Sequence, residues 1–483
     1  MSASGSEPAR GALGVGLVYW SELAPLFAPG SAVVDVLELE PQALWEKGWH
    51  DGGWRYRVNE GLLEQVAGLP QAKLVHGVAQ PLGGTTPDPV EHVSLLRHAV
   101  DLLDPSWISE HLSFNRVERP SGVEEAGFLL PPRQTAAGVR VAADNIEGFR
   151  QALGRPVAFE TGVSYLRRRD DELDDASYFR AVAETADCGI LLDLHNLWCN
   201  EVNGRDRVSD VLAGLPLDRV WEMHLAGGMP LSGYWLDAHS GAVPPPVIDL
   251  AAELMPRLRG LRALMFEILP EHLPTIGIDG VHRQIEALRA LWALKPRETL
   301  PPIGASSSTS KRAHGRPEDV DEARAWENAL VDLIRGRTTG ASPYGDVAAD
   351  PGIDILRELV GDFRRAGLTR ALRYTMTALL AGLGSQQTHA LLDAYIAQED
   401  ADPYPAVESD RFARFLRERP GILDQVQYLR ETLDFEHGLL RATLFGATTE
   451  IEWSADPTAI FDALDSGHLP TALPPMHSTM RIG

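Results

Sequence analysis

Eight short runs of apolar, β-prone residues recur between Gly14 and Leu269, and each has the length of a β-strand. Stretches with a helical period, such as Val90–Leu103, separate most of these runs, and Val281–Leu291 follows the last. Alternation of strands and helices over about 250 residues predicts an α/β fold whose parallel sheet closes into a (β/α)8 TIM-type barrel. A doubly wound open sheet is the structural alternative. The eight runs are Val15–Trp20, Val33–Leu39, Lys73–Val78, Trp107–Phe114, Val157–Glu160, Ile190–His195, Val220–Leu225 and Ala263–Ile268.

The composition changes after the eighth run. Residues 299–320 are rich in Pro, Gly and Ser, cannot bury much apolar area, and therefore predict a linker. Beyond it, segments with helical periodicity and one strand-like segment predict a smaller, mainly helical domain at 321–470. We expect a disordered N-terminus at 1–13, the barrel at 14–298 and a loosely ordered tail at 471–483. The segments are Glu322–Arg335, Ile353–Ala366, Leu372–Leu383, Thr388–Gln398, Ser409–Arg419, Leu423–Leu440 and the strand-like Thr449–Trp453.

Charge and cysteine content limit the binding partners and the cellular compartment that we expect for this protein. The formal net charge is −24, from 68 acidic and 44 basic residues, which disfavours a nucleic-acid or anionic-membrane partner. Cys188 and Cys199 are the only cysteines in 483 residues, so no disulfide framework holds the fold. No signal peptide or long apolar run is evident. We therefore expect a cytoplasmic protein.

Metal-ligand side chains gather at the predicted carboxyl ends of the strands, where the βα loops of a barrel converge on its active site. Imidazole with carboxylate, and no thiolate, suits Fe, Mn, Zn or Co. The candidates exceed what one ion uses, so the sequence predicts a cluster in which carboxylates such as Asp193 or Glu267 bridge ions. The alternative is that these groups pair among themselves. The candidates are His76, Glu110, His111, Glu160, Asp193, His195, Asn196, Glu222, His224, Asp237, His239 and Glu267.

Two further features have weaker interpretations. Glu38 and Glu40, at the end of the second run, are typical of a solvated acidic edge or of a cap on the next helix. Trp45, Trp49 and Trp54 either line a substrate pocket or seal the rim of the barrel.

The ordered motifs Gly14–Tyr19, VHG, SEHLSF, LLDLHN, EMHLAG, LDAHSG and FEI, within residues 14–290, resemble the DUF692 (UPF0276) family. This family includes multinuclear non-heme iron-dependent oxidative enzymes of the methanobactin-biosynthesis type. The resemblance implies two or three irons (Fe2+/Fe3+) and O2 as co-substrate. It implies oxidation of a ribosomal precursor peptide, often at Cys, with Asp or Asn modified by other members.

The resemblance also implies a set of metal ligands. Many relatives have DVNN where this chain has DLHN, so His195 and Asn196 both remain candidates. The family's LEN is FET here, which retains Glu160 and places Thr161 where Asn is usual, and this puts the orientation of the ligand in doubt. The implied ligands are His76, His111, Glu160, Asp193, His224, Asp237, His239 and Glu267.

The segment beyond the linker loosely resembles DUF2063-type partner proteins, which implies a peptide-presenting module fused to the enzyme. Its alternative is a helical domain that only packs on the barrel or dimerises. Two rival functions stay open: a non-redox divalent-metal isomerase or hydrolase of the xylose-isomerase type, and a non-catalytic peptide-binding module.

Overall fold

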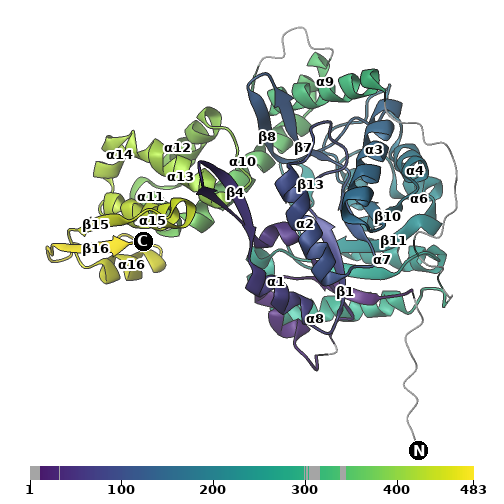
Figure 1. Cartoon of the computed structure of the whole chain (residues 1–483), viewed down its shortest axis with the longest axis horizontal. Helices are drawn as coiled ribbons and strands as arrows, with labels where there is room; N and C mark the ends of the chain where they lie inside the picture. The colour runs from purple at the N-terminus through teal and green to yellow at the C-terminus, as the bar shows by residue number, and fades with distance from the viewer. Residues whose placement is uncertain (1–10, 32, 298–299, 301–302, 304–315, 338–343) are drawn as a thin grey trace, which may run out of the picture. The chain divides into compact units, whose positions relative to one another are not determined.

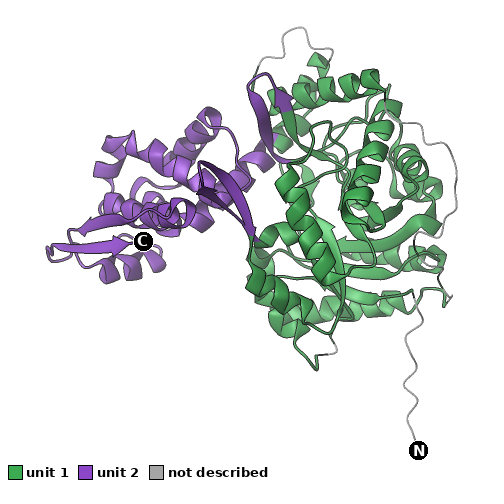
Figure 2. Ribbon diagram, in the orientation of Figure 1, with its two compact units in different colours: residues 1–44, 58–117, 129–356 green, residues 45–57, 118–128, 357–483 purple. Residues whose placement is uncertain are grey.

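The computed structural model describes residues 11–31, 33–297, 300, 303, 316–337 and 344–483 (Figure 1). Contacts divide the chain into two compact units (Figure 2). Unit 1 comprises residues 1–44, 58–117 and 129–356, and unit 2 comprises residues 45–57, 118–128 and 357–483. Residues 1–10 of the expected N-terminal segment and most of the expected linker lie outside the described residues.

Eight parallel strands of unit 1 form a closed barrel in which strands that follow one another along the chain are neighbours. Each strand coincides with one of the eight predicted runs, so the predicted TIM-type fold is confirmed and the open sheet is excluded. The strands are buried along nearly their whole length, as expected when helices cover the outer face. They are β1 (Gly14–Val18), β2 (Val36–Leu39), β5 (Ala72–Gly77), β6 (Ile108–His111), β9 (Val157–Glu160), β10 (Gly189–Asp193), β11 (Val220–Ala226) and β14 (Ala263–Glu267).

Amphipathic helices follow the strands. In the helix of residues 136–153, Val139, Ala142, Ile146 and Phe149 recur every three or four residues and are buried. The Thr135 side chain accepts a hydrogen bond from the Gly138 N–H and so caps this helix. Among the described residues, no helix is long and apolar enough to cross a membrane. The helices of unit 1 are α1 (Glu60–Ala67), α2 (Val90–Leu103), α3 (Ala136–Leu153), α4 (Asp175–Ala186), α5 (Leu194–Val202), α6 (Val208–Gly214), α7 (Pro245–Leu254), α8 (Leu273–Trp292) and α9 (Pro317–Ile334).

Three β-hairpins occupy loops that follow barrel strands. The loop after β2 holds β3 (Trp45–His50) and β4 (Gly53–Val58), and the loop after β6 leads into β7 (Phe114–Arg119) and β8 (Gly122–Leu130). Their outer parts belong to unit 2. There, the Trp54 ring lies 5.4 Å from Trp49 and 5.9 Å from Phe445. The described ring contacts of Trp49 and Trp54 therefore belong to the packing of unit 2. The third hairpin, β12 (Met229–Leu231) and β13 (Tyr234–Leu236), stays in unit 1.

Unit 2 has its own helical core, which confirms the prediction of a mainly helical region after the barrel. Tyr428 has a φ of +61° and separates two helices where the sequence predicts one, Leu423–Leu440. The chain end pairs antiparallel with residues 449–453, which differs from the loosely ordered tail expected at 471–483. The elements are α10 (Gly352–Ala371), α11 (Arg373–Leu383), α12 (Ser385–Gln398), α13 (Pro405–Arg417), α14 (Pro420–Gln425), α15 (Leu429–Phe445), β15 (Thr449–Trp453), α16 (Pro457–Asp465) and β16 (Ser478–Ile482).

Helix α9 belongs to unit 1, although the sequence places residues 321–335 in the second domain. Asp319 forms a buried ion pair with Arg140 of α3. The Trp326 indole N–H donates to the Pro131 carbonyl at 3.0 Å. Glu327 accepts hydrogen bonds from the Thr85 N–H at 2.9 Å and from the Thr85 hydroxyl at 2.6 Å. These tertiary contacts move the boundary from the expected linker to residue 356.

The Glu327 carboxyl gives α9 a pH-dependent attachment. Burial raises its pKa from 4.5 to about 7, against the opposing effect of the hydrogen bonds from Thr85. Between these values the native state binds more protons than the unfolded state, so the free energy of unfolding decreases as pH rises from about 4.5 to about 7. The Glu327→Gln variant keeps both contacts with Thr85, because its amide oxygen accepts and its amide N–H donates.

We expect Glu327→Gln to remove a pH-dependent loss of stability of at most about 3 kcal/mol. The measurement is the urea midpoint at pH 5, 6, 7 and 8 for wild type and variant. Glu318→Gln, at an exposed position of the same helix, serves as the matched control and should follow wild type. An equal pH slope in wild type and Glu327→Gln would contradict this assignment.

Candidate metal centre

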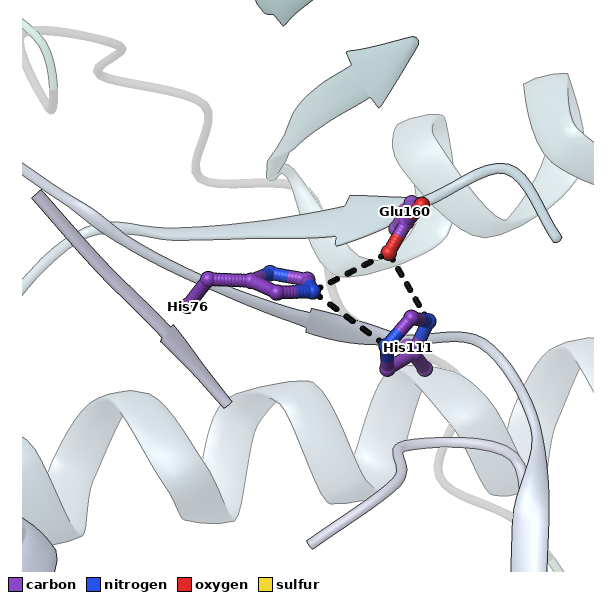
Figure 3. Close-up of side chains that lie close together, drawn as sticks. All are labelled: His76, His111 and Glu160. Carbon is purple, nitrogen blue, oxygen red and sulfur yellow. Dashed lines mark hydrogen bonds and ion pairs between the residues drawn. The ribbon is translucent and has the colours of Figure 1, made fainter. Parts of the chain in front are cut away.

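His76, His111 and Glu160 come from three neighbouring strands and meet at their carboxyl ends (Figure 3). The Glu160 Oε2 atom lies 2.8 Å from His111 Nδ1 and 3.2 Å from His76 Nε2. The two histidine Nε2 atoms are 3.2 Å apart. His76 Nδ1 contacts the Ser109 hydroxyl at 2.9 Å, which orients the ring so that Nε2 faces Glu160.

A second set of side chains surrounds His224 on β11. His224 Nδ1 lies 3.0 Å from Glu267 Oε1, and His224 Nε2 lies 3.1 Å from Glu38 Oε1. Asp193 on β10 pairs in register with His224. All four side chains are less than 6% exposed, so they form the water-poor floor of the site.

The loop after the β12–β13 hairpin brings Asp237 and His239 to the same place. His239 Nε2 lies 3.2 Å from Asp237 Oδ1 and 3.3 Å from Glu267 Oε2. The Asp237 N–H donates to the Tyr165 hydroxyl, and the Leu269 N–H donates to the His239 carbonyl. His239 has a φ of +45°, a left-handed conformation that costs free energy in a residue other than glycine and that these contacts maintain.

The donors form four overlapping groups, within each of which one ligand atom per residue lies within 4.8 Å of the others. Glu160, Asp193, His224 and Glu267 each belong to two groups, so neighbouring groups share a side chain. Seven of the ten predicted ligands thus belong to these groups, which add Glu38, and Asp237 lies beside them, in contact with His239. The groups are His76–His111–Glu160, Glu38–His224–Glu267, Glu160–Asp193–His224 and Asp193–His239–Glu267.

The donor set fits metal cations. Two ligands bound at about 2.1 Å to one ion are themselves about 3.0 to 3.4 Å apart. The His76–Glu160, His224–Glu38, His224–Glu267 and His239–Glu267 donor pairs are 3.0 to 3.3 Å apart, whereas His111 Nδ1 and Glu160 Oε2 are closer, at 2.8 Å. Among the described residues, Glu160 Oε2, Asp193 Oδ2, Glu267 Oε2 and both Glu38 oxygens are buried, and imidazole nitrogens lie 2.8 to 3.3 Å from Glu160 Oε2, Glu38 Oε1 and Glu267 Oε2. No lysine or arginine in that part of the chain pairs with these carboxylates. The imidazoles and carboxylates thus pair among themselves in this structure, and the same atoms are candidate ligands for multivalent cations.

The carboxylates differ in electrostatic environment. Burial, with the charges of Asp237 and Glu160, raises the pKa of Asp193 well above its ordinary value. Burial and Glu222 raise the pKa of Glu38 to about 8. Burial also acts on Glu160, but His111 and His76 lower its pKa well below the usual range. Protons on Asp193 and Glu38 thus compete with metal ions for the same oxygens.

Neighbouring side chains form hydrogen bonds with the backbone of the candidate ligands. The Glu110 carboxylate accepts hydrogen bonds from the backbone N–H groups of His111 and Gln80, and a β-carbon at Gly77 would collide with it. The Thr161 hydroxyl accepts a hydrogen bond from the Asp193 N–H at 3.0 Å. Thr161 therefore contacts the end of β10, at Asp193, and not the Glu160 carboxylate.

His195 and Asn196, the two uncertain ligands, lie in the first turn of α5. His195 Nδ1 is 3.1 Å from Asp237 Oδ1, and its Nε2 is 3.2 Å from the Trp235 indole nitrogen. The Asn196 backbone N–H donates a hydrogen bond to Asp193 Oδ1 at 2.7 Å, so that Asp193 caps the helix. His195 belongs to none of the four donor groups, which consist of His, Asp and Glu side chains.

Glu38 is the member of the site that sequence reasoning missed. It is fully buried and contacts His224, so its interpretation as a solvated edge or helix cap is wrong. The available signal is its place within VLEL, a strand that is buried on both faces and in which a carboxylate must point into the core or the barrel interior. Glu40 is partly exposed and lies outside the donor groups.

A closed parallel barrel with a shared set of imidazoles and carboxylates at one end defines the class: a TIM barrel with a candidate multinuclear metal centre. A family model described as "RiPP precursor modification enzyme MbnB/TglH/ChrH" matches residues 16–277. The chain belongs to this family, whose members modify precursors of ribosomally synthesised, post-translationally modified peptides.

Similar proteins cover one or both parts of the chain. A UPF0276 protein of Chromobacterium violaceum is 32% identical over 237 residues, covering 48% of this chain and 82% of that protein. A UPF0276 protein of Streptomyces avermitilis is 26% identical over 453 residues, covering 89% of this chain and 88% of that protein. Among solved structures, L-ribulose 3-epimerase is 14% identical with a TM-score of 0.36, covering 66% of this chain and 98% of that structure. The zinc-bound IOLI protein is 10% identical with a TM-score of 0.37, covering 59% and 99%.

We expect Glu38→Gln to weaken metal uptake about tenfold or more, because it removes a charged donor beside His224 and Glu267. The measurement is bound metal per chain after anaerobic loading with Fe(II) and gel filtration. Glu222→Gln is the matched control, since Glu222 is equally buried but accepts a hydrogen bond from the Trp107 indole and belongs to no donor group. Equal losses in the two variants would show that Glu38 contributes only negative charge.

Proposed function

We propose that this chain catalyses an iron- and O2-dependent oxidation of a ribosomally synthesised precursor peptide in natural-product biosynthesis. Cysteine is the expected target residue, and Asp or Asn is the alternative. The observation that carries the proposal is the overlap of four His and carboxylate donor groups at the mouth of a barrel whose family modifies RiPP precursors.

The donor chemistry favours two or three iron ions. Imidazole and carboxylate ligands suit Fe(II), and shared carboxylates such as Glu160 and Asp193 can bridge ions and offset their mutual repulsion. Cys199 lies beside His195, and burial raises the pKa of its thiol. It belongs to none of the four donor groups of the described residues. When bound, iron supplies the electron-transfer chemistry with O2 that protein side chains lack.

The protein's own contribution is binding, orientation and exclusion of water. Asp193, His195 and His224 are 0% exposed, whereas the side chains of His111, Asp237 and His239 are 21%, 15% and 26% exposed. The reacting group of the peptide therefore approaches the accessible side of the centre, beside these three residues. The buried floor keeps water from the opposite side and raises the strength of each electrostatic contact.

We extend the proposal to unit 2 as a module that binds the precursor peptide. The Streptomyces avermitilis relative aligns over both parts of the chain, which supports a conserved association of the two units in one polypeptide. Tethering the peptide to its enzyme would raise its effective concentration at the site. Packing or dimerisation by unit 2 alone is the alternative outcome. We place the reaction in the cytoplasm, where Cys188 and Cys199 remain free thiols.

The test is anaerobic loading with Fe(II), followed by O2 and the precursor peptide encoded beside the gene. Mass spectrometry should show an O2-dependent change in peptide mass. Both His111→Ala and Asp237→Ala should reduce the rate by about 100-fold or more, because each removes a predicted ligand. His98→Ala, which changes an exposed histidine paired with Glu60, should retain the wild-type rate.

Two results would redirect the assignment. A reaction supported by Mn, Mg or Zn without O2 would point to a non-redox isomerase or hydrolase. An unchanged mass for every neighbouring precursor peptide, with iron bound, would count against peptide oxidation.

A further inference from the structure

We propose that His195 is a positioning residue that holds Asp237 in place and is not itself a ligand of the metal ions. The inference rests on the proposed metal centre. It assigns a role to His195, the histidine of the DLHN motif where many relatives have DVNN. His195 is fully buried, and both of its ring nitrogens face protein side chains.

Trp235 determines the side of the ring on which the proton resides. An indole nitrogen only donates hydrogen bonds, so the Trp235 N–H, 3.2 Å from His195 Nε2, requires a lone pair on that nitrogen. A protonated Nε2 would place two donors against each other in a buried site. The lone pair of Nε2 is therefore engaged and is unavailable to a metal ion.

With Nε2 accepting from Trp235, Nδ1 is the ring nitrogen left to donate. It donates to Asp237 Oδ1 at 3.1 Å. The Tyr165 hydroxyl, which accepts from the Asp237 N–H at 3.2 Å, holds the backbone of the same residue. Asp237 is thus fixed at both its main chain and its carboxylate before any cation binds.

Local packing enforces the contact between His195 and Trp235. A β-carbon on Gly228 would collide with the Trp235 indole nitrogen and lie 2.8 Å from His195 Nε2. Only glycine leaves room for the two rings to meet. On the other side, the Cys199 thiol lies 3.5 Å from His195 Nε2, one turn further along α5. These neighbours limit rotation of the imidazole away from Asp237.

Asn196 differs from His195 in this respect. Its side-chain oxygen is buried and accepts no hydrogen bond from the described residues. Of the two uncertain ligands, Asn196 therefore retains a free donor atom and His195 does not. The three polar residues of DLHN therefore have different roles. Asp193 is a candidate ligand, His195 is a positioning residue, and the side-chain oxygen of Asn196 is available to the centre.

The experiment measures binding of Co(II), as a spectroscopic probe, by anaerobic titration against a chelator and by elemental analysis. His195→Leu removes the donor to Asp237. His195→Asn restores this donor, because the amide nitrogen of asparagine is bonded to Cγ, as Nδ1 of histidine is. Both variants are also made in an Asp237→Asn background, which separates an effect through Asp237 from a direct one.

We expect His195→Leu to bind the wild-type number of Co(II) ions with at least one of them about tenfold weaker, and a changed visible spectrum. His195→Asn should recover to within about threefold of wild type. In the Asp237→Asn background, His195→Leu should have no further effect on Co(II) affinity. If His195 had a purely structural role, His195→Leu in the wild-type background would lower thermal stability and leave Co(II) affinity unchanged.

The proposal is overturned if His195→Leu loses one ion outright and His195→Asn fails to restore it, as expected of a ligand. It is equally overturned if the loss from His195→Leu persists in full when Asp237 is Asn. Because the probe needs neither O2 nor peptide, wild-type protein that binds Co(II) but oxidises no peptide would defeat the proposed function alone. Wild-type protein that binds neither Co(II) nor Fe(II) would defeat both.

Discussion

Concentrated negative charge in a space that water hardly reaches is the constraint on which this structure depends. The carboxyl ends of the barrel strands hold carboxylates from β2, β9, β10 and β14, and within the described part of the chain the cationic partners found for those of β2, β9 and β14 are imidazoles. Each buried, unpaired carboxylate costs several kcal/mol, and a folded domain is stable by only about 5 to 15 kcal/mol. A cation held by these carboxylates would offset part of that cost, because a ligand that binds the native state shifts the folding equilibrium towards it.

The centre is built in layers that are held by different contacts. Strand backbones fix the innermost side chains, such as His224, through regular parallel pairing. A hairpin and a left-handed residue, His239, supply the outer side chains, and hydrogen bonds from Tyr165 and Leu269 restrain them. The inner layer is held by the hydrogen-bonded strands of the barrel, whereas the outer layer depends on a few specific contacts.

The fold could be predicted because strands covered on both faces are continuous apolar runs, and eight such runs alternate with helices. The strand-end histidines and carboxylates could be predicted because the barrel topology sends every strand end to one rim. Glu38 could not be identified by proximity to a motif, since its partner His224 is 186 positions away along the chain and across the barrel interior. The attachment of α9 also depends on single side chains, such as Asp319 and Glu327, whose partners no local pattern reveals.

The chain passes between the two units five times, at residues 44, 57, 117, 128 and 356. Two excursions from barrel loops, residues 45–57 and 118–128, complete a fold whose remainder lies beyond residue 356. A two-stranded hairpin is marginally stable without further packing. Joining two genes end to end would therefore not by itself produce this molecule. If its ancestors were separate polypeptides, the barrel gene must have gained, or already carried, residues 45–57 and 118–128, which the second unit requires. For the same reason, no single proteolytic cut can release that unit intact.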